Sequence, residues 1–326
     1  MPAAEAQDNK ITVRVKTVPG LTDARPLSGP VRLVLETSDS SGNPVDVERL
    51  NIRLRAPRSH WFFSTDFPLV EGRLLSEMIV PVSRGRVEWE YLFPIRGVYR
   101  LEVESVDDGG PQITEALELR IKESRIKLLL LAAFILALFL FGFTAGRFFT
   151  SPRPQPSLKM TMGIFVLLTV STLTSTIGEA ALLESGGLVA RMQVEPATVG
   201  RPSRIDWSVV DVKSGEPVAS RLSLTITHLE KGTPIFSLEE MLTEGNFSLS
   251  FQFTDGARHQ VTSVAAIAGE ALVVTEETIS VQAVEPPLRT VLPSIGFFIA
   301  VIAFGLVVGR ISRQRLGARG WTFPLP

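Results

Sequence analysis

Three stretches without a charged residue constrain this chain most, because each is long enough to cross a membrane as a helix. With 19 residues each, they are 128–146, 160–178 and 291–309. At a rise of about 1.5 Å per residue, about 20 apolar residues cross the hydrocarbon core of a bilayer. The middle stretch is the most polar, since it carries seven Ser and Thr residues, and hydroxyls in a span face protein rather than lipid. We predict three transmembrane helices, at 125–149, 160–182 and 290–309.

The composition agrees with a membrane protein and argues against several kinds of site. The chain of 326 residues is 45% hydrophobic with a mean hydropathy of +0.23, which is unusual for a soluble protein. Because it has no cysteine, disulfides, thiol catalysis and thiolate-held zinc or iron–sulfur centres are ruled out. The net charge of -1 argues against a nucleic-acid partner. With three histidines far apart in sequence, we predict no catalytic residue, no cofactor and no metal site.

Small residues recur at a four-residue spacing in the first and third predicted spans. This spacing removes side-chain bulk along one stripe of a helix and lets two helix backbones approach closely. The predicted helix-packing residues are Gly142, Gly146, Gly296, Ala300, Gly305 and Gly309. The sequence leaves open whether the packing partner is a helix of this chain or of another subunit.

Lys and Arg in the short connections predict the orientation, because such residues are retained on the cytoplasmic side. The Pro-rich connection 150–159 and the tail 310–326 carry basic residues and no acid, so we place both in the cytoplasm. The long segments 1–124 and 185–288 then lie together on the periplasmic side of a bacterial inner membrane. This membrane is either the cytoplasmic membrane or an intracytoplasmic one. In these two segments acidic residues outnumber basic ones, by 19 to 16 and by 13 to 7.

Two features oppose or complicate this orientation. The outer flank of the first span carries three basic residues, namely Lys122, Arg125 and Lys127. The stretch 1–10 lacks the apolar core of a signal peptide, although Ala4-Glu5-Ala6 looks like a cleavage site. Either the true start lies upstream, or the first span exports the segment before it. If neither holds, both long segments are cytoplasmic.

Both long segments alternate apolar and polar residues at a period of two, which is typical of half-buried β-strands. Examples are Val31/Leu33/Leu35 and Tyr99/Leu101/Val103 in the first segment, and Ile205/Trp207/Val209 and Leu222/Leu224/Ile226 in the second. Clusters of Gly, Asn, Pro and Asp separate the runs. Seven or eight short strands per ~100 residues are the signature of an antiparallel sandwich. The predicted fold class is a multi-domain membrane protein with two all-β immunoglobulin-like sandwiches and three transmembrane α-helices.

The two segments resemble each other, as two copies of an internal repeat would. Residues 34–45 and 209–218 each run from an apolar strand into a turn and then Gly-x-Pro-Val, and 93–99 parallels 253–259. The pattern resembles the immunoglobulin-like (YtkA-like) β-sandwich domains of membrane-anchored bacterial extracytoplasmic proteins, best over 194–218. The Met-rich segment that accompanies such domains is absent here.

Aromatic and basic residues supply candidate contacts with a partner or with the bilayer interface. Trp61, Phe62 and Phe63 form either an exposed docking loop or a strand with core aromatics. In the tail, the arginines are expected to meet anionic headgroups and the aromatic residues to anchor the chain. These tail residues are Arg310, Arg313, Arg315, Trp321 and Phe323.

The histidines have simpler interpretations at this level. His259 follows the turn signal Asp255-Gly256, so we predict a solvated strand residue. His228 lies near Glu230, which allows a metal pair but agrees better with ordinary loop polarity.

The function predicted from these features is a non-enzymatic accessory, structural or assembly subunit of a larger bacterial membrane complex, of respiratory or photosynthetic type. Its partners would be other membrane-protein subunits, the lipid bilayer and a basic periplasmic protein such as a cytochrome, attracted by the acidic sandwiches. The alternative is a membrane-anchored extracytoplasmic protein that delivers a ligand or a metal such as copper.

Overall fold

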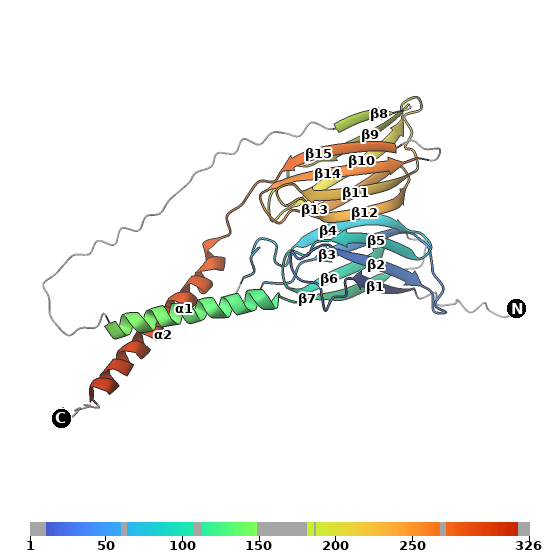
Figure 1. The fold of residues 1–326 in the computed structure, drawn as a ribbon. Helices are drawn as coiled ribbons and strands as arrows, with labels where there is room; N and C mark the ends of the chain where they lie inside the picture. The colour runs from blue at the N-terminus through green and yellow to red at the C-terminus, as the bar shows by residue number, and fades with distance from the viewer. Residues whose placement is uncertain are drawn as a thin grey trace. The chain divides into compact units, whose positions relative to one another are not determined.

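The computed structural model describes residues 11–59, 64–106, 113–148, 181–185, 187–267 and 272–318. The chain divides into two units (Figure 1). The β unit comprises Met1–Glu123 and Ser175–Pro286, and the helix unit comprises Ser124–Thr174 and Pro287–Pro326.

The described residues of the first half of the β unit contain seven strands, in which buried side chains alternate with more exposed ones. They are β1 (Thr12–Val18), β2 (Val31–Ser38), β3 (Val47–Arg55), β4 (Leu74–Val82), β5 (Arg86–Tyr91), β6 (Gly97–Ser105) and β7 (Thr114–Ile121). The alternating residues predicted for these strands point into a core, because a period of two places every second side chain on the same face.

The second half of the β unit repeats this arrangement and adds one strand at its start. Its strands are β8 (Ala181–Ser185), β9 (Leu188–Val194), β10 (Pro202–Asp211), β11 (Ser220–His228), β12 (Thr233–Thr243), β13 (Asn246–Gln252), β14 (Arg258–Ala266) and β15 (Leu272–Ser280). Strand β8 begins inside the range predicted for the second span, so residues 181–182 are extended rather than helical.

Each half has the same two-layer topology. In the first half, β1-β2-β5 lies opposite β7-β6-β3-β4, and in the second, β9-β10-β13 lies opposite β15-β14-β11-β12, with β8 beside β9. All described strand pairs are antiparallel, and the shared strand order makes both halves immunoglobulin-like sandwiches.

The two sandwiches share their sheets. Strand β5 pairs with β12, and β4 pairs with β13 (Figure 1). The described strands of the β unit therefore form one seven-stranded and one eight-stranded sheet. A free sandwich would expose these four strands as edges, and unpaired strand edges are sites of aggregation. Pairing the edges inside the chain removes that liability. We call this shared region the joint.

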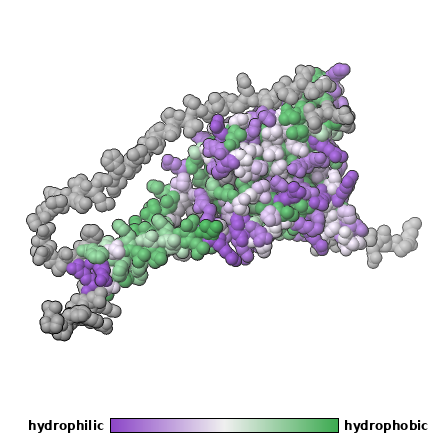
Figure 2. All heavy atoms as spheres, in the orientation of Figure 1, coloured by the Kyte–Doolittle hydropathy of each residue, from purple (hydrophilic) through white to green (hydrophobic). Residues whose placement is uncertain are grey.

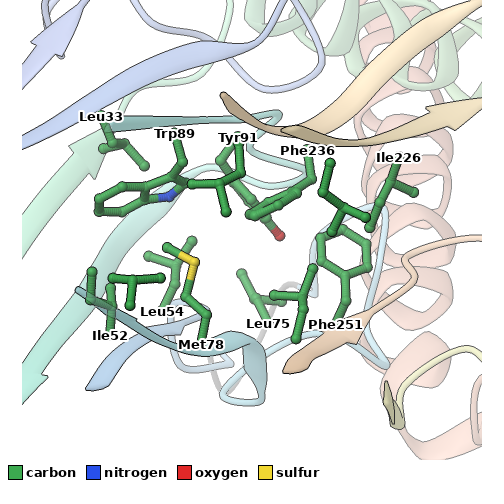
Figure 3. Close-up of a cluster of buried hydrophobic side chains, with 14 of the residues drawn as sticks. Leu33, Ile52, Leu54, Leu75, Met78, Trp89, Tyr91, Ile226, Phe236 and Phe251 are labelled. Carbon is green, nitrogen blue, oxygen red and sulfur yellow. The ribbon is translucent and has the colours of Figure 1, made fainter. Parts of the chain in front are cut away.

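Buried side chains continue across the joint, as Figure 3 shows. Tyr91 on β5 lies opposite Phe236 on β12, and both side chains are buried. Phe251 on β13 contacts both rings, with ring centroids 6.2 Å from Tyr91 and 5.8 Å from Phe236. Trp89 and Met78 are also buried there. The two sandwiches therefore share one hydrophobic core.

The internal repeat is confirmed at the turns that follow β2 and β10. Gly42 and Gly215 have φ of 85° and 72°, which only glycine adopts without strain. The carboxylate Oδ1 of Asp39 accepts hydrogen bonds from two backbone N–H groups in the first turn, and that of Asp211 does so in the second. These bonds hold the pKa of both carboxyls below its ordinary value.

The helix unit contains two described helices, α1 (Arg125–Phe148) and α2 (Leu288–Ala318). Both are long and apolar enough to cross a membrane, and most of their apolar side chains are exposed, as the green surface in Figure 2 shows. Helix α2 continues past the predicted end at Gly309. The predicted span 160–182 lies outside the described residues, apart from its last two residues.

Candidate functional site

The best-defined contact that the predicted site residues make is the one between α1 and α2. Gly142 and Gly146 are buried against α2, where a Cβ atom would overlap the carbonyl oxygens of Ile302 and Leu306. Four residues further along α1, the contact lies four residues further along α2, so the two helices run parallel.

The glycines of α2 make the reciprocal contact. A Cβ atom on Gly305 would overlap the carbonyl oxygen of Phe139, and one on Gly309 that of Phe143. Phenylalanine rings pack beside this contact, with the ring centroids of Phe139 and Phe304 5.9 Å apart. The four glycines therefore form a backbone-to-backbone contact within the chain, as small residues do in membrane helix pairs.

The looser pair on α2 lies outside this contact. Gly296 and Ala300 are exposed, and a Cβ atom on Gly296 would meet no atom within 4 Å. Gly296 and Ala300 therefore do not pack against α1, and their role in helix packing stays a prediction. The reason is the rotation of an α-helix, because positions 296 and 300 lie on a different side of α2 from 305 and 309.

The remaining predicted contact residues lie at or beyond the margins of the described chain. Arg310 is exposed on α2, and Arg313 donates a hydrogen bond to the carbonyl oxygen of Arg147 at 3.3 Å. Arg315 lies in α2, but its side chain lies outside the described part. Trp61, Phe62, Phe63, Trp321 and Phe323 also lie outside the described residues.

A second built feature lies at the start of β6 in the first sandwich. The hydroxyl of Tyr99 donates to the carbonyl oxygen of Ile95 at 2.6 Å and accepts from the Ile95 N–H at 3.0 Å. The Tyr99 ring meets the ring of Phe93 edge-on at 4.7 Å. This arrangement matches the tyrosine corner of immunoglobulin-like sandwiches, which fixes the turn between two strands.

In the second sandwich, the matching corner holds a cluster of polar side chains, His228, Asp255, His259 and Lys231. His259 takes the place of the tyrosine, with its ring 4.9 Å from that of Phe253. The Nε2 atom of His228 lies 3.1 Å from Asp255 Oδ2, and Nε2 of His259 lies 3.6 Å from Asp255 Oδ1. Lys231 Nζ lies 3.2 Å from Asp255 Oδ2. We call these four residues the histidine corner.

Burial sets the charges in the histidine corner. The side chains of His228 and His259 are 4% and 1% exposed, against 26% for Asp255. Burial lowers the pKa of His259, although the Asp255 carboxylate opposes this effect. Burial also disfavours the Asp255 carboxylate, but hydrogen bonds and charge from Lys231 and His228 outweigh it and lower the pKa of Asp255. At neutral pH, a neutral His259 therefore faces a charged Asp255.

The sequence-based interpretation of these histidines was wrong. His259 is buried in β14 rather than solvated, and His228 is the buried last residue of β11, partnered by Asp255 rather than by Glu230. The signal that was available is the match of 93–99 with 253–259, which aligns His259 with a buried tyrosine. Only the pairing of β11 with β14 brings His228 to the same corner.

The described residues define a class of protein, one with two immunoglobulin-like sandwiches fused through their sheets and, in the part that the structure describes, two long apolar helices. No family model matches the sequence, and no curated protein matches it.

Among solved structures, the chain is similar to the bacterial integrin-binding protein invasin, at 11% identity over 85% of this chain and 40% of that chain, with a TM-score of 0.23. A segment of two fibronectin type III domains from chicken tenascin gives 7% identity, 82% and 97% coverage and a TM-score of 0.20. Trypsin-activated alpha-2-macroglobulin from Escherichia coli is 12% identical over 83% of this chain and 16% of that chain, with a TM-score of 0.26. The chain thus spans less than half of invasin and of alpha-2-macroglobulin. At these scores the likeness carries no argument about function, and the fold assignment depends on the strand order above.

Proposed function

We propose that this chain is a membrane-anchored, non-enzymatic accessory or assembly subunit of a larger bacterial membrane complex, of respiratory or photosynthetic type. The observation that supports this most is the exposed apolar surface of α1 and α2. Large exposed apolar patches mark membrane or protein contact sites. Exposed apolar side chains dominate the central parts of both helices outside the glycine contact, which agrees with a helix pair surrounded by lipid and by other spans.

The joint supports a specific membrane topology. Because the two halves of the β unit share their sheets, both lie on the same side of any membrane that α1 and α2 cross. Since α1 and α2 are parallel, a chain that spans the membrane with both helices would cross back between Phe148 and Ala181. The uncharged stretch 160–178 has the length for that crossing. This argument favours three spans, with the β unit in the periplasm and the arginines of 310–326 in the cytoplasm.

The two sets of small residues suggest separate roles in docking. Gly142, Gly146, Gly305 and Gly309 hold the chain's own helices together. Gly296 and Ala300, which lie outside that contact, would receive a neighbouring helix within the bilayer. The β unit would cover a periplasmic surface of the complex, and its excess of acidic residues would attract a basic partner by long-range electrostatics.

A pull-down in mild detergent tests this proposal. The tagged full-length chain is purified from its native membrane, and its partners are read by native gel and mass spectrometry. We expect stoichiometric co-purification of other membrane subunits. A chain that runs alone as a monomer in repeated preparations would refute the docking function.

A matched pair of glycine variants sharpens the experiment. Gly296→Leu fills open space and should leave the α1–α2 pair intact. It should weaken co-purification, because it adds bulk to the side of α2 that carries Gly296 and Ala300. Gly146→Leu should separate α1 from α2, because its side chain would overlap the backbone at Leu306. If Gly296→Leu co-purifies partners as well as the wild type does, the side of α2 that carries Gly296 and Ala300 is not a docking contact.

A further inference from the structure

We propose that the histidine corner is a binding site for one divalent transition-metal ion of the zinc class, with His228, Asp255 and His259 as ligands. The inference is independent of the docking function, since metal uptake requires no partner. It differs from what the sequence predicts, because the three ligands come from two strands and a loop that only the fold brings together.

Comparison of the two sandwiches shows that the fold itself does not require these residue types. Continuing the β3–β6 register by one residue places Ala56 opposite Tyr99, just as His228 lies opposite His259. Two residues after Phe93, the first sandwich has Ile95. Two residues after the matching Phe253, the second sandwich has Asp255. Where one copy of the corner has alanine, isoleucine and tyrosine, the other has three metal-ligating side chains.

The ligand atoms lie at separations that suit a small ion. One ligand atom from each of the three residues lies within 4.8 Å of the others. With metal–ligand bonds of about 2.0–2.1 Å in tetrahedral geometry, ligand atoms are about 3.3 Å apart. The Nε2 atom of His228 lies 3.1 Å from Oδ2 of Asp255 and that of His259 lies 3.6 Å from Oδ1, so each imidazole is near this separation from one oxygen of the carboxylate. Two imidazoles and one carboxylate favour zinc and similar metals over magnesium or calcium.

The hydrogen bond that His259 makes already fits a metal ligand. Its Nδ1 atom lies 3.2 Å from the carbonyl oxygen of Ala257, which can only accept, so Nδ1 carries the proton. The lone pair of Nε2 then faces Asp255 Oδ1, a buried oxygen with no hydrogen-bond partner among the described residues. A cation held between Nε2 and Oδ1 would give this buried carboxylate oxygen a partner. A ligating histidine whose other nitrogen donates to a carbonyl is the usual arrangement at metal sites.

His228 and Lys231 must adjust when the ion binds. The His228 Nε2 proton, donated to Asp255 in the tautomer that the structure favours, moves to Nδ1, and the long 3.4 Å bond from the Lys231 N–H to Nδ1 is lost. The Lys231 ammonium, which is mostly exposed, leaves Asp255 Oδ2 and turns to solvent. Lys231 thus occupies the place of a cation and competes with the metal.

A bound ion would reinforce the end of the sandwich from which the chain continues to α2. The carbonyl oxygen of Ala257, which holds His259, also accepts a hydrogen bond from the Val281 N–H just after β15. Fixing His259 therefore fixes the start of this connection. The near-complete burial of both imidazoles favours a resident ion over one that is readily exchanged.

Metal titration of the purified full-length chain, carrying a tag without histidine, tests the site. We expect one Zn²⁺ per chain by mass spectrometry of metals after dialysis, and a Co²⁺ absorption spectrum typical of nitrogen and oxygen ligands. Asp255→Asn keeps the shape and the hydrogen bond from Lys231, and should weaken Zn²⁺ binding by at least the about 10–100-fold that losing an outer-shell partner of a ligand costs. Lys231→Met should strengthen it severalfold.

The third histidine of the chain provides the matched control. His60→Ala should bind Zn²⁺ as the wild type does, and His259→Gln should not bind it. Circular dichroism checks the fold of each variant, and Asp255→Asn remains decisive if His259→Gln misfolds. Absence of saturable Zn²⁺ uptake by the wild type, or equal uptake by Asp255→Asn, would overturn the proposal.

Discussion

The joint predicts that the two sandwiches unfold as one cooperative unit, and Phe236→Ala tests this. The Phe236 side chain is fully buried on β12, lies opposite Tyr91 of the first sandwich and packs edge-on against Phe251 at 5.8 Å. Truncating a buried phenylalanine to alanine costs about 3–5 kcal/mol. This is a large part of the ~5–15 kcal/mol that stabilises a typical domain. Because the ring belongs to a core shared by both sandwiches, the loss should destabilise both.

Hydrogen exchange read peptide by peptide, on the full-length chain in detergent or nanodiscs, measures this directly. Since about 1.4 kcal/mol is a tenfold change, exchange through global unfolding should accelerate by about a hundredfold to a few thousandfold. We expect the same acceleration in β3 and β6 as in β11 and β14. Glu239→Ala, at an exposed position on the same strand, should change nothing. Faster exchange confined to β11 and β14 would show two independent domains and refute the reasoning.

Three further predictions concern single residues. Gly146→Leu should abolish the α1–α2 contact, measured as loss of cysteine cross-linking between engineered positions on the two helices, while Gly296→Leu should preserve it. Tyr99→Phe leaves the buried N–H and carbonyl of Ile95 unpaired and should cost about 1–3 kcal/mol in denaturant unfolding; an unchanged midpoint would contradict the corner's role. Burial raises the pKa of Glu277 from 4.5 to about 7, so its carboxylate destabilises the fold as pH rises from 4.5 through 7. After allowance for solvent screening, Glu277→Gln should be more stable than wild type by about 1–2 kcal/mol at pH 8 and nearly equal to it at pH 4; equal stability at both pH values would show that the carboxylate is solvated.

Helices α1 and α2 and many of the strands could be predicted because their signals are local. An uncharged apolar stretch such as 128–146 forms a helix in any apolar surrounding, since a helix satisfies its own backbone hydrogen bonds. Alternation such as that around Leu222 and Leu224 specifies a strand with one buried side. Likewise, the spacing of Gly142 and Gly146 specifies a smooth stripe on a helix before any partner is known.

The partners of these elements could not be predicted, because pairing depends on contacts between distant residues. Nothing in β12 by itself selects β5 as its neighbour, and nothing in His228 by itself selects His259. A strand edge can pair with any other edge, and only the whole set of registers decides which pairing buries the most apolar surface.

The sequence by itself determined two repeated β-sandwiches, long apolar helices and a set of small residues that permits close helix contact. Tertiary structure alone decided that the sandwiches share two sheets, that Gly305 and Gly309 rather than Gly296 contact α1, and that two histidines and an aspartate meet at one corner. The physical reason is that periodicity records only which side of an element is buried. The identity of the residues that bury it is a property of the folded chain.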